Sequence, residues 1–126
     1  MKFSVDNQER YTLFRLEEEN LNSLIAPDLK SKFVIIRNEG VKNLILNLAD
    51  VKYVDSSGLS AILTADRIWK GFGAFILTGI EHENVKKLIK ISRLTQVFTI
   101  IPTVAEAIDY VLMDEIEREL NADPEE

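Results

Sequence analysis

The feature that most constrains the fold is a continuous apolar segment, Val41 to Leu48, that leads through a polar corner into an apolar helix. A strand with apolar residues on both faces usually belongs to a sheet covered by helices. The corner reads Asp55-Ser56-Ser57-Gly58, and the helix predicted after it runs from Leu59 to Lys70. This β–α unit predicts an α/β protein.

The rest of the chain alternates strand and helix patterns in a regular order. The predicted segments are strands at 2–6 and 11–16, a helix capped by Asn22 or Ser23 and stopped at 38–40, a strand at 41–48, the helix 59–70, a strand at 74–78, a helix at 83–91, a strand at 97–101 and a helix capped by Thr103 with Glu106. This order predicts a single domain with a mostly parallel central sheet of about five strands, an N-terminal hairpin and about four helices.

Length and composition limit the class of protein. The chain has 126 residues, enough for one domain that buries its own core. It contains no cysteine, which excludes a disulfide framework, a thiolate metal site and a cysteine nucleophile. No signal-peptide pattern opens the sequence, and no apolar run approaches the ~18 residues of a membrane span. We therefore expect a soluble cytoplasmic domain.

The net charge of −6 is concentrated at one end of the chain. Seven of the 21 acidic residues, but only one of the 15 basic residues, lie between Asp114 and Glu126. We expect residues 1–113 to form the domain and residues 114–126 to be the acidic end of the last helix and a tail. That end is either a solvated terminus or an acidic binding arm. Nucleic-acid binding is not predicted, because it requires a basic surface.

The Asp55–Gly58 corner has a structural and a functional interpretation. In the structural one, a serine caps the helix, Asp55 satisfies backbone N–H groups and Gly58 permits close packing. In the functional one, a serine also accepts a phosphoryl group, which brings about −1.5 to −2 charges. The dipole at a helix N-terminus favours such an anion by roughly 0.3–1 kcal/mol. The fold should tolerate the modification, so its effect would fall on a bound partner.

Catalytic chemistry is not indicated elsewhere in the sequence. No glycine stands two residues before Ser56 or Ser57, as in the nucleophile elbow of many serine hydrolases. The single histidine, His82, is predicted to be a solvated loop residue. There is no phosphate-binding G-x-x-x-x-G-K motif and no cluster of metal ligands. We therefore predict no catalytic residue, metal or cofactor, and a protein that is not an enzyme.

The segment 44–59, Leu-Ile-Leu-Asn-Leu-Ala-Asp-Val-Lys-Tyr-Val-Asp-Ser-Ser-Gly-Leu, resembles the central segment of STAS domains, which are named for sulfate transporters and anti-sigma factor antagonists. Segments 75–80, 85–88 and 94–98 follow the same family pattern, so the resemblance covers about nine-tenths of the chain. Within the family, the sequence is most similar to the free-standing anti-sigma factor antagonists of bacteria. The resemblance implies one STAS-like α/β domain.

The resemblance also implies a mechanism. Such antagonists bind, while unphosphorylated, an anti-sigma factor that is also a serine kinase, and so free a sigma factor. The kinase phosphorylates the serine directly after the aspartate, which ends binding, and a serine phosphatase reverses the step. Carried over by position, the phosphoacceptor is Ser56, with Ser57 as the second choice and the helix cap. The implied partner-binding residues are Asp55, Ser56, Ser57, Gly58 and Leu59.

A second hypothesis remains open within the same family. STAS-like domains also act as docking subunits of lipid-transport or stress-signalling assemblies, without a covalent cycle, and Ser56 would then be structural. The chain departs from the family pattern after the second strand, where Glu18–Asn22 replaces a Gly-Glu-Leu-Asp-type element. That element commonly borders the partner surface, so the resemblance does not identify the partner.

Overall fold

The computed structural model of the chain describes residues 1–122. In chain order its elements are β1 (Phe3–Asn7), β2 (Thr12–Leu16), β3 (Asn20–Leu21), α1 (Ala26–Asn38), β4 (Leu44–Asn47), β5 (Tyr53–Val54), α2 (Ser56–Trp69), β6 (Phe75–Thr78), α3 (Glu83–Ile91), β7 (Thr99–Ile101) and α4 (Val104–Asn121). All the predicted strands and helices are present. The two-residue strands β3 and β5 are additional, because segments this short carry no periodic pattern.

Five of the strands form one sheet in the order β1-β2-β4-β6-β7. β1 and β2 are antiparallel, with Phe3 opposite Leu16, and the other neighbouring pairs in this sheet are parallel. The predicted mostly parallel sheet with an N-terminal hairpin is therefore confirmed. β3 and β5 form a separate two-stranded parallel sheet, with Leu21 opposite Val54.

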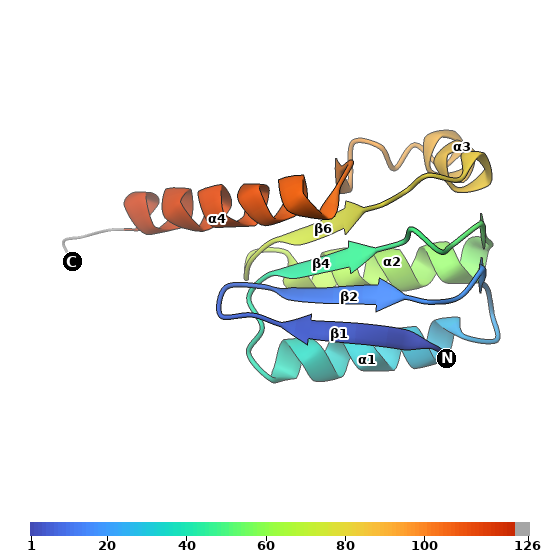
Figure 1. Cartoon of the computed structure of the whole chain (residues 1–126), viewed down its shortest axis with the longest axis horizontal. Helices are drawn as coiled ribbons and strands as arrows, with labels where there is room; N and C mark the ends of the chain where they lie inside the picture. The colour runs from blue at the N-terminus through green and yellow to red at the C-terminus, as the bar shows by residue number, and fades with distance from the viewer. Residues whose placement is uncertain (123–126) are drawn as a thin grey trace.

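The two faces of the five-stranded sheet pack against different helices. The parallel strands follow one another in a single direction across the sheet, so right-handed crossovers place α1, α2 and α3 on the same face. Leu44 and Leu46 of β4 belong to the core cluster on that face. Ile45, which points to the opposite face, packs with Ala107 and Val111 of α4. Figure 1 shows α4 running along the sheet and extending past the ends of the strands.

An aromatic cluster joins α1 and α2 to the sheet. The ring of Phe33 in α1 lies 5.9 Å from Phe14, 6.4 Å from Trp69 and 6.3 Å from Phe75. Such pairs contribute about 0.5–1.5 kcal/mol each beyond their buried area. The Trp69 indole is fully buried, and its Nε1 donates to the backbone carbonyl of Val41 at 3.1 Å. The cluster fixes the C-terminal end of α2. The start of that helix follows directly after β5.

The start of α1 differs from the sequence prediction. Asn22 or Ser23 was expected to cap this helix, but the N-cap position is Ile25, which makes no side-chain capping bond. The Asn22 side chain instead accepts from the backbone N–H of Leu24 at 3.0 Å, within the turn before the helix. The Asn22 side-chain oxygen is therefore used within the local turn and does not cap the helix. The predicted cap of α4 is confirmed, because Thr103 Oγ1 accepts from the backbone N–H of Glu106.

The acidic C-terminal segment divides into described and undescribed parts. The boundary expected between residues 113 and 114 falls inside α4, which continues without interruption to Asn121. The part of the expected acidic tail at residues 123–126 lies outside the described residues. None of the helices within residues 1–122 combines the length and the hydrophobicity needed to cross a bilayer.

Candidate functional site

The corner before α2 is capped by Asp55, and not by a serine as the sequence suggested. The Asp55 backbone is extended, with φ −100° and ψ −174°, and its Oδ1 accepts from the Gly58 backbone N–H at 2.9 Å. The helix therefore begins at Ser56, three residues before the predicted start at Leu59. A carboxylate at this position satisfies a free N–H group and also meets the positive end of the helix dipole. The prediction that Ser57 is the cap is wrong.

The two serines occupy the first two positions of the helix. Within residues 1–122, no hydrogen bond involves the hydroxyl of either Ser56 or Ser57. Ser56 is exposed, whereas Ser57 is half-buried. Of the two hydroxyls, the one on Ser56 is therefore the more accessible to another protein.

The short strand β3 packs against the corner. The backbone N–H of Asp55 donates to the carbonyl of Leu21 in β3 at 3.1 Å, which extends the pairing of β3 with β5. Gly58 packs so closely on this strand that a Cβ atom there would lie 2.3 Å from the Leu21 carbonyl oxygen. The predicted role of Gly58 in close packing is confirmed. Because β3 and β5 are only two residues long, this close contact is part of what fixes the corner.

The five predicted partner-binding residues differ in how far they face solvent. Asp55 and Ser56 are exposed, Ser57 and Leu59 are half-buried, and Gly58 is buried. Gly58 is therefore placed to support the corner, while the exposed pair is placed to meet another molecule.

Two neighbouring aromatic side chains were not singled out as part of this site in the sequence. Tyr53, on β5 directly before the corner, is 52% exposed, and its ring lies 5.5 Å from the ring of His82. His82 is half-buried and caps α3, because its Nδ1 accepts from the Asn84 backbone N–H at 3.3 Å. His82 therefore lies in the loop before α3, as predicted, but it is only partly exposed and its side chain caps the helix. The position of His82 directly before a predicted helix was the available signal.

An ion pair lies at the same edge of the sheet. The Arg15 guanidinium donates from both Nε and Nη2 to the Asp50 carboxylate, at 3.0 Å in each case. These hydrogen bonds lower the pKa of the Asp50 carboxyl, and they raise the pKa of Arg15. The pair joins β2 to the loop between β4 and β5, and both of its side chains face solvent.

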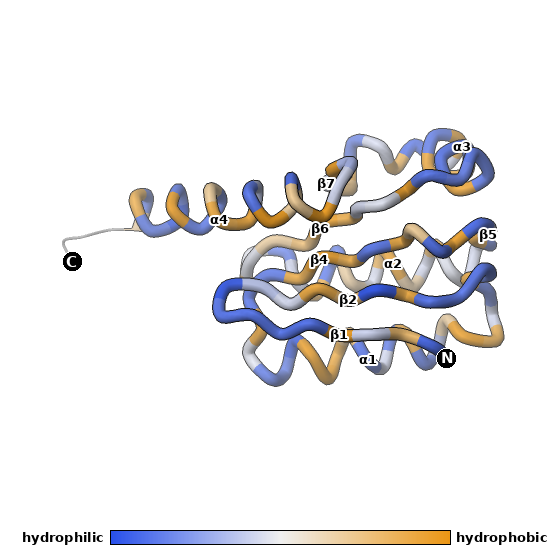
Figure 2. Tube along the Cα trace, in the orientation of Figure 1, coloured by the Kyte–Doolittle hydropathy of each residue, from blue (hydrophilic) through white to orange (hydrophobic). Residues whose placement is uncertain are grey.

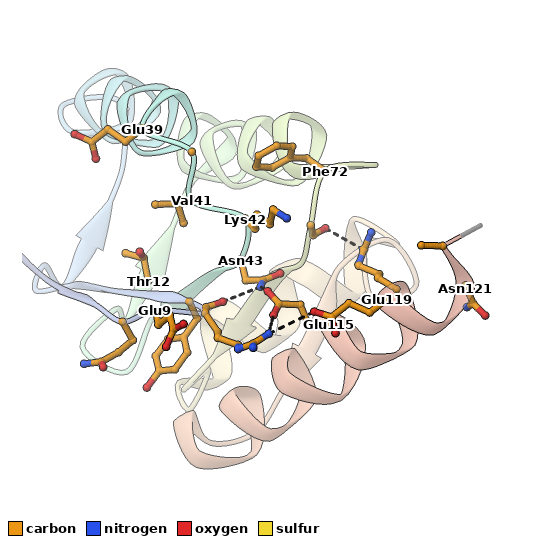
Figure 3. Close-up of a pocket in the computed structure, with 17 residues that line it drawn as sticks. Glu9, Thr12, Glu39, Val41, Lys42, Asn43, Phe72, Glu115, Glu119 and Asn121 are labelled. Atoms are coloured by element: carbon orange, nitrogen blue, oxygen red, sulfur yellow. Dashed lines mark hydrogen bonds and ion pairs between the residues drawn. The ribbon is translucent and has the colours of Figure 1, made fainter. Parts of the chain in front are cut away.

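A large cavity lies at the opposite end of the strands. It measures about 970 Å³ and is bounded by the β1–β2 turn, the segment after α1 and the far half of α4. Asn43 is buried here, and its amide donates to the Arg10 carbonyl and to Glu115, and accepts from the Ala74 N–H. Figure 3 shows Glu115 reaching from α4 toward Asn43. Arg10, Asn43 and Glu115 bond to one another at this cavity, and none of the predicted site residues lines it.

The fold and the corner together define a small α/β domain in which a solvent-facing serine opens the helix after the central strand. The family model described as STAS domain matches residues 2–107, and the chain belongs to this family. The resemblance noted in the sequence is thereby confirmed.

Named relatives support the same assignment. A curated homologue from Thermotoga neapolitana, named as an anti-sigma factor antagonist, is 28% identical over 74 residues, which cover 59% of this chain and 66% of the relative. A solved anti-sigma factor antagonist from Thermotoga maritima is 25% identical, with a TM-score of 0.76 over 86% of this chain and 93% of the other.

The anti-sigma factor antagonist SpoIIAA has been solved in two forms. Its unphosphorylated form is 25% identical to this chain, with a TM-score of 0.73 over 87% of this chain and 96% of the other. The phosphorylated form of the Bacillus cell fate determinant SpoIIAA is 24% identical, with a TM-score of 0.68 over 87% and 99%. Both forms share the fold described above.

Proposed function

We propose that this protein is an anti-sigma factor antagonist, and that phosphorylation of Ser56 ends its binding to an anti-sigma factor. The observation that carries the proposal is the exposed Ser56 hydroxyl at the first position of a helix that Asp55 already caps. The relative SpoIIAA, an anti-sigma factor antagonist by name, is known in an unphosphorylated and a phosphorylated form. The proposed partners are an anti-sigma factor with serine kinase activity and a serine phosphatase. The protein itself acts by binding and not by catalysis.

The geometry of the corner allows phosphorylation without loss of the fold. The cap bond runs through the Asp55 carboxylate, so a phosphate on Ser56 breaks no bond that holds the helix start. The helix dipole favours an anion at this position by roughly 0.3–1 kcal/mol. The nearby Asp55 carboxylate repels the phosphate, but both groups are exposed and water screens them.

The effect on a partner is much larger than the effect on the fold. Two exposed apolar side chains lie on the segments that lead to the corner: Tyr53, on β5 three residues before Ser56, is 52% exposed, and Leu24, three residues after the paired strand β3, is 86% exposed. A partner that covers these groups also removes Ser56 from water. A desolvated, unpaired phosphate then costs several kcal/mol, and about 3–4 kcal/mol is enough to weaken binding by two to three orders of magnitude.

Phosphate mapping tests the proposal directly. The protein is incubated with ATP and its cognate anti-sigma kinase, and the modified residue is identified by mass spectrometry. We expect phosphate on Ser56 in the wild type and none in Ser56→Ala, while Ser60→Ala serves as a matched control one turn further along α2. Phosphate on another residue, with none on Ser56, contradicts the proposed switch.

Binding measurements separate the switch from simple docking. Ser56→Asp is expected to weaken the complex with the anti-sigma factor by about two orders of magnitude. Its melting temperature should stay close to that of the wild type, because the new carboxylate sits at a helix N-terminus. If Ser56→Asp and the wild type bind equally and neither accepts phosphate, the docking-subunit hypothesis replaces the switch.

A further inference from the structure

The first half of α4 packs against the sheet, whereas the second half projects beyond it. Ala107 and Val111 are fully buried, but no residue of the helix after Val111 is buried within residues 112–122. Figure 1 shows this part of α4 projecting past the amino ends of the strands. The STAS family model also stops at residue 107, so the projecting part lies outside what the family shares.

Polar contacts along one side of the helix hold this projecting part in place. Glu115 pairs with Arg10 and accepts from the Asn43 amide. Arg118 donates to the Gly73 carbonyl at 3.2 Å and pairs with Asp114 at 2.8 Å. Glu115 and Arg118 are three residues apart and therefore share one side of α4, so their contacts fix which side faces the domain and leave the opposite side in solvent.

That opposite side carries an apolar stripe. Its members share one side of the helix at helical spacing, and they are Leu112 at 37% exposure, Met113 at 60%, Ile116 at 48% and Leu120 at 77%. We call these four residues the projecting stripe. Figure 2 shows the hydrophobic residues alternating with hydrophilic ones along this part of α4. An isolated amphipathic face of this kind is the pattern that binds another amphipathic helix.

The charges beside the stripe select the kind of helix it accepts. Asp109 and Glu117 lie on the same side as the stripe by their spacing, both are exposed, and neither forms an ion pair within residues 1–122. From residue 112 to residue 122 the helix carries four acids, Asp114, Glu115, Glu117 and Glu119, and one base, Arg118. Two copies of the stripe facing each other would bring Asp109 and Glu117 of both copies to one contact, and like charges oppose that pairing.

We propose that the projecting stripe is a docking site for a basic amphipathic helix of a second protein. That helix has apolar anchors at i, i+3 or i+4, and i+7, with Lys or Arg beside them to meet Asp109 and Glu117. The site lies at the end of the strands opposite the Ser56 corner, so it binds its partner whether or not Ser56 is phosphorylated.

The test uses the full chain and a labelled heptad-repeat peptide with Leu and Ile anchors and flanking lysines. Fluorescence anisotropy is expected to show saturable binding that weakens as salt is raised. A control peptide with glutamate in place of each lysine should not bind. Ile116→Ala with Leu120→Ala, and separately Asp109→Lys with Glu117→Lys, should each weaken binding at least about tenfold.

Matched variants identify the surface. Ile35→Ala removes an apolar side chain of similar exposure, 51%, from α1 and should leave binding unchanged, as should Ser56→Asp. Absence of binding, equal binding of the acidic peptide, or equal weakening by Ile35→Ala overturns the proposal. Sedimentation that shows a dimer, dissolved by Ile116→Ala with Leu120→Ala, assigns the stripe to a second copy instead. None of these outcomes depends on whether Ser56 is a phosphoacceptor.

Discussion

The polar groups at the two ends of the parallel strands differ in whether they are bonded to other groups of the protein. At the amino end, the buried Asn43 amide, Arg10 and Glu115 bond to one another beside a cavity of about 970 Å³. At the carboxyl end, Ser56 stands in solvent, and its hydroxyl makes no hydrogen bond among the described residues.

This difference separates an end whose polar groups serve the structure from the end that carries the proposed functional site. Polar groups that satisfy each other stabilise the attachment of α4 and have little capacity left for a ligand. Polar groups that stay unbonded at a rigid helix start are available to a kinase or a partner. In this domain the exposed and unbonded Ser56 hydroxyl is a better guide to the candidate site than the cavity at the amino end. Five substitutions test the comparison.

Gly58→Ala should have the largest effect. The new Cβ would lie 2.3 Å from the Leu21 carbonyl oxygen, which is backbone and cannot rotate away. We expect a loss of about 3 kcal/mol in the free energy of unfolding, measured by urea denaturation. Ser60→Ala, an exposed position on the same helix, is the control. A loss below about 1 kcal/mol would mean that β3 yields easily and that the corner is not rigid.

Asn43→Ala tests the amino end. The substitution removes three hydrogen bonds and leaves the Ala74 N–H, at a buried position, without its partner. A loss of about 2 kcal/mol in unfolding free energy is expected. Exposed Asn38, changed to alanine, provides the comparison. Binding at the Ser56 corner should be unaffected in the folded variant, and an equal effect at both ends would show that they are coupled.

Asp55→Ala and Ser57→Ala decide which residue caps α2. Asp55 makes the capping bond to Gly58, so its removal should cost about 1 kcal/mol of stability. Ser57→Ala should change stability by less than about 0.5 kcal/mol. Thermal denaturation of the two variants measures the difference, and the reverse order would restore the serine as the cap.

Arg15→Gln should have the smallest effect on stability, because both partners of the Arg15–Asp50 pair are exposed and screened by water. Hydrogen bonds from Arg15 lower the pKa of Asp50, so the substitution should raise that pKa toward its usual value. A carboxyl with a lowered pKa in the folded state adds stability above its unfolded pKa and loses it as the pH falls. The variant and the wild type should therefore converge below about pH 4. An NMR titration of the Asp50 carboxyl measures the shift, and an unchanged pKa would contradict the assigned cause.

Much of the fold could be predicted from local patterns. The helix at Glu83–Ile91 has the predicted bounds, and Thr103 caps α4 as expected. These elements carry strong periodicity or a capping sequence, and both act within a few residues. β3 and β5 could not be predicted, because two-residue strands exist only where distant segments meet.

The polar corner before the helix could be located from the sequence, but the roles of its individual residues could not. Asp55, Ser56 and Ser57 are all good capping residues, so local preference does not choose among them. The choice follows from the hydrogen bond between the Asp55 N–H and the Leu21 carbonyl, which sets where the backbone turns into the helix. Which serine faces solvent follows from the same contact.

The sequence by itself determined the α/β order and the position of the serine corner, because these depend on periodicity and on residues adjacent in the chain, and its resemblance to STAS domains pointed to the family. Only the tertiary structure decided that Asp55 is the cap, that Gly58 must lack a side chain, and that α4 extends beyond the sheet after Val111. Each of these depends on contacts between segments far apart in sequence, whose distances no local pattern records.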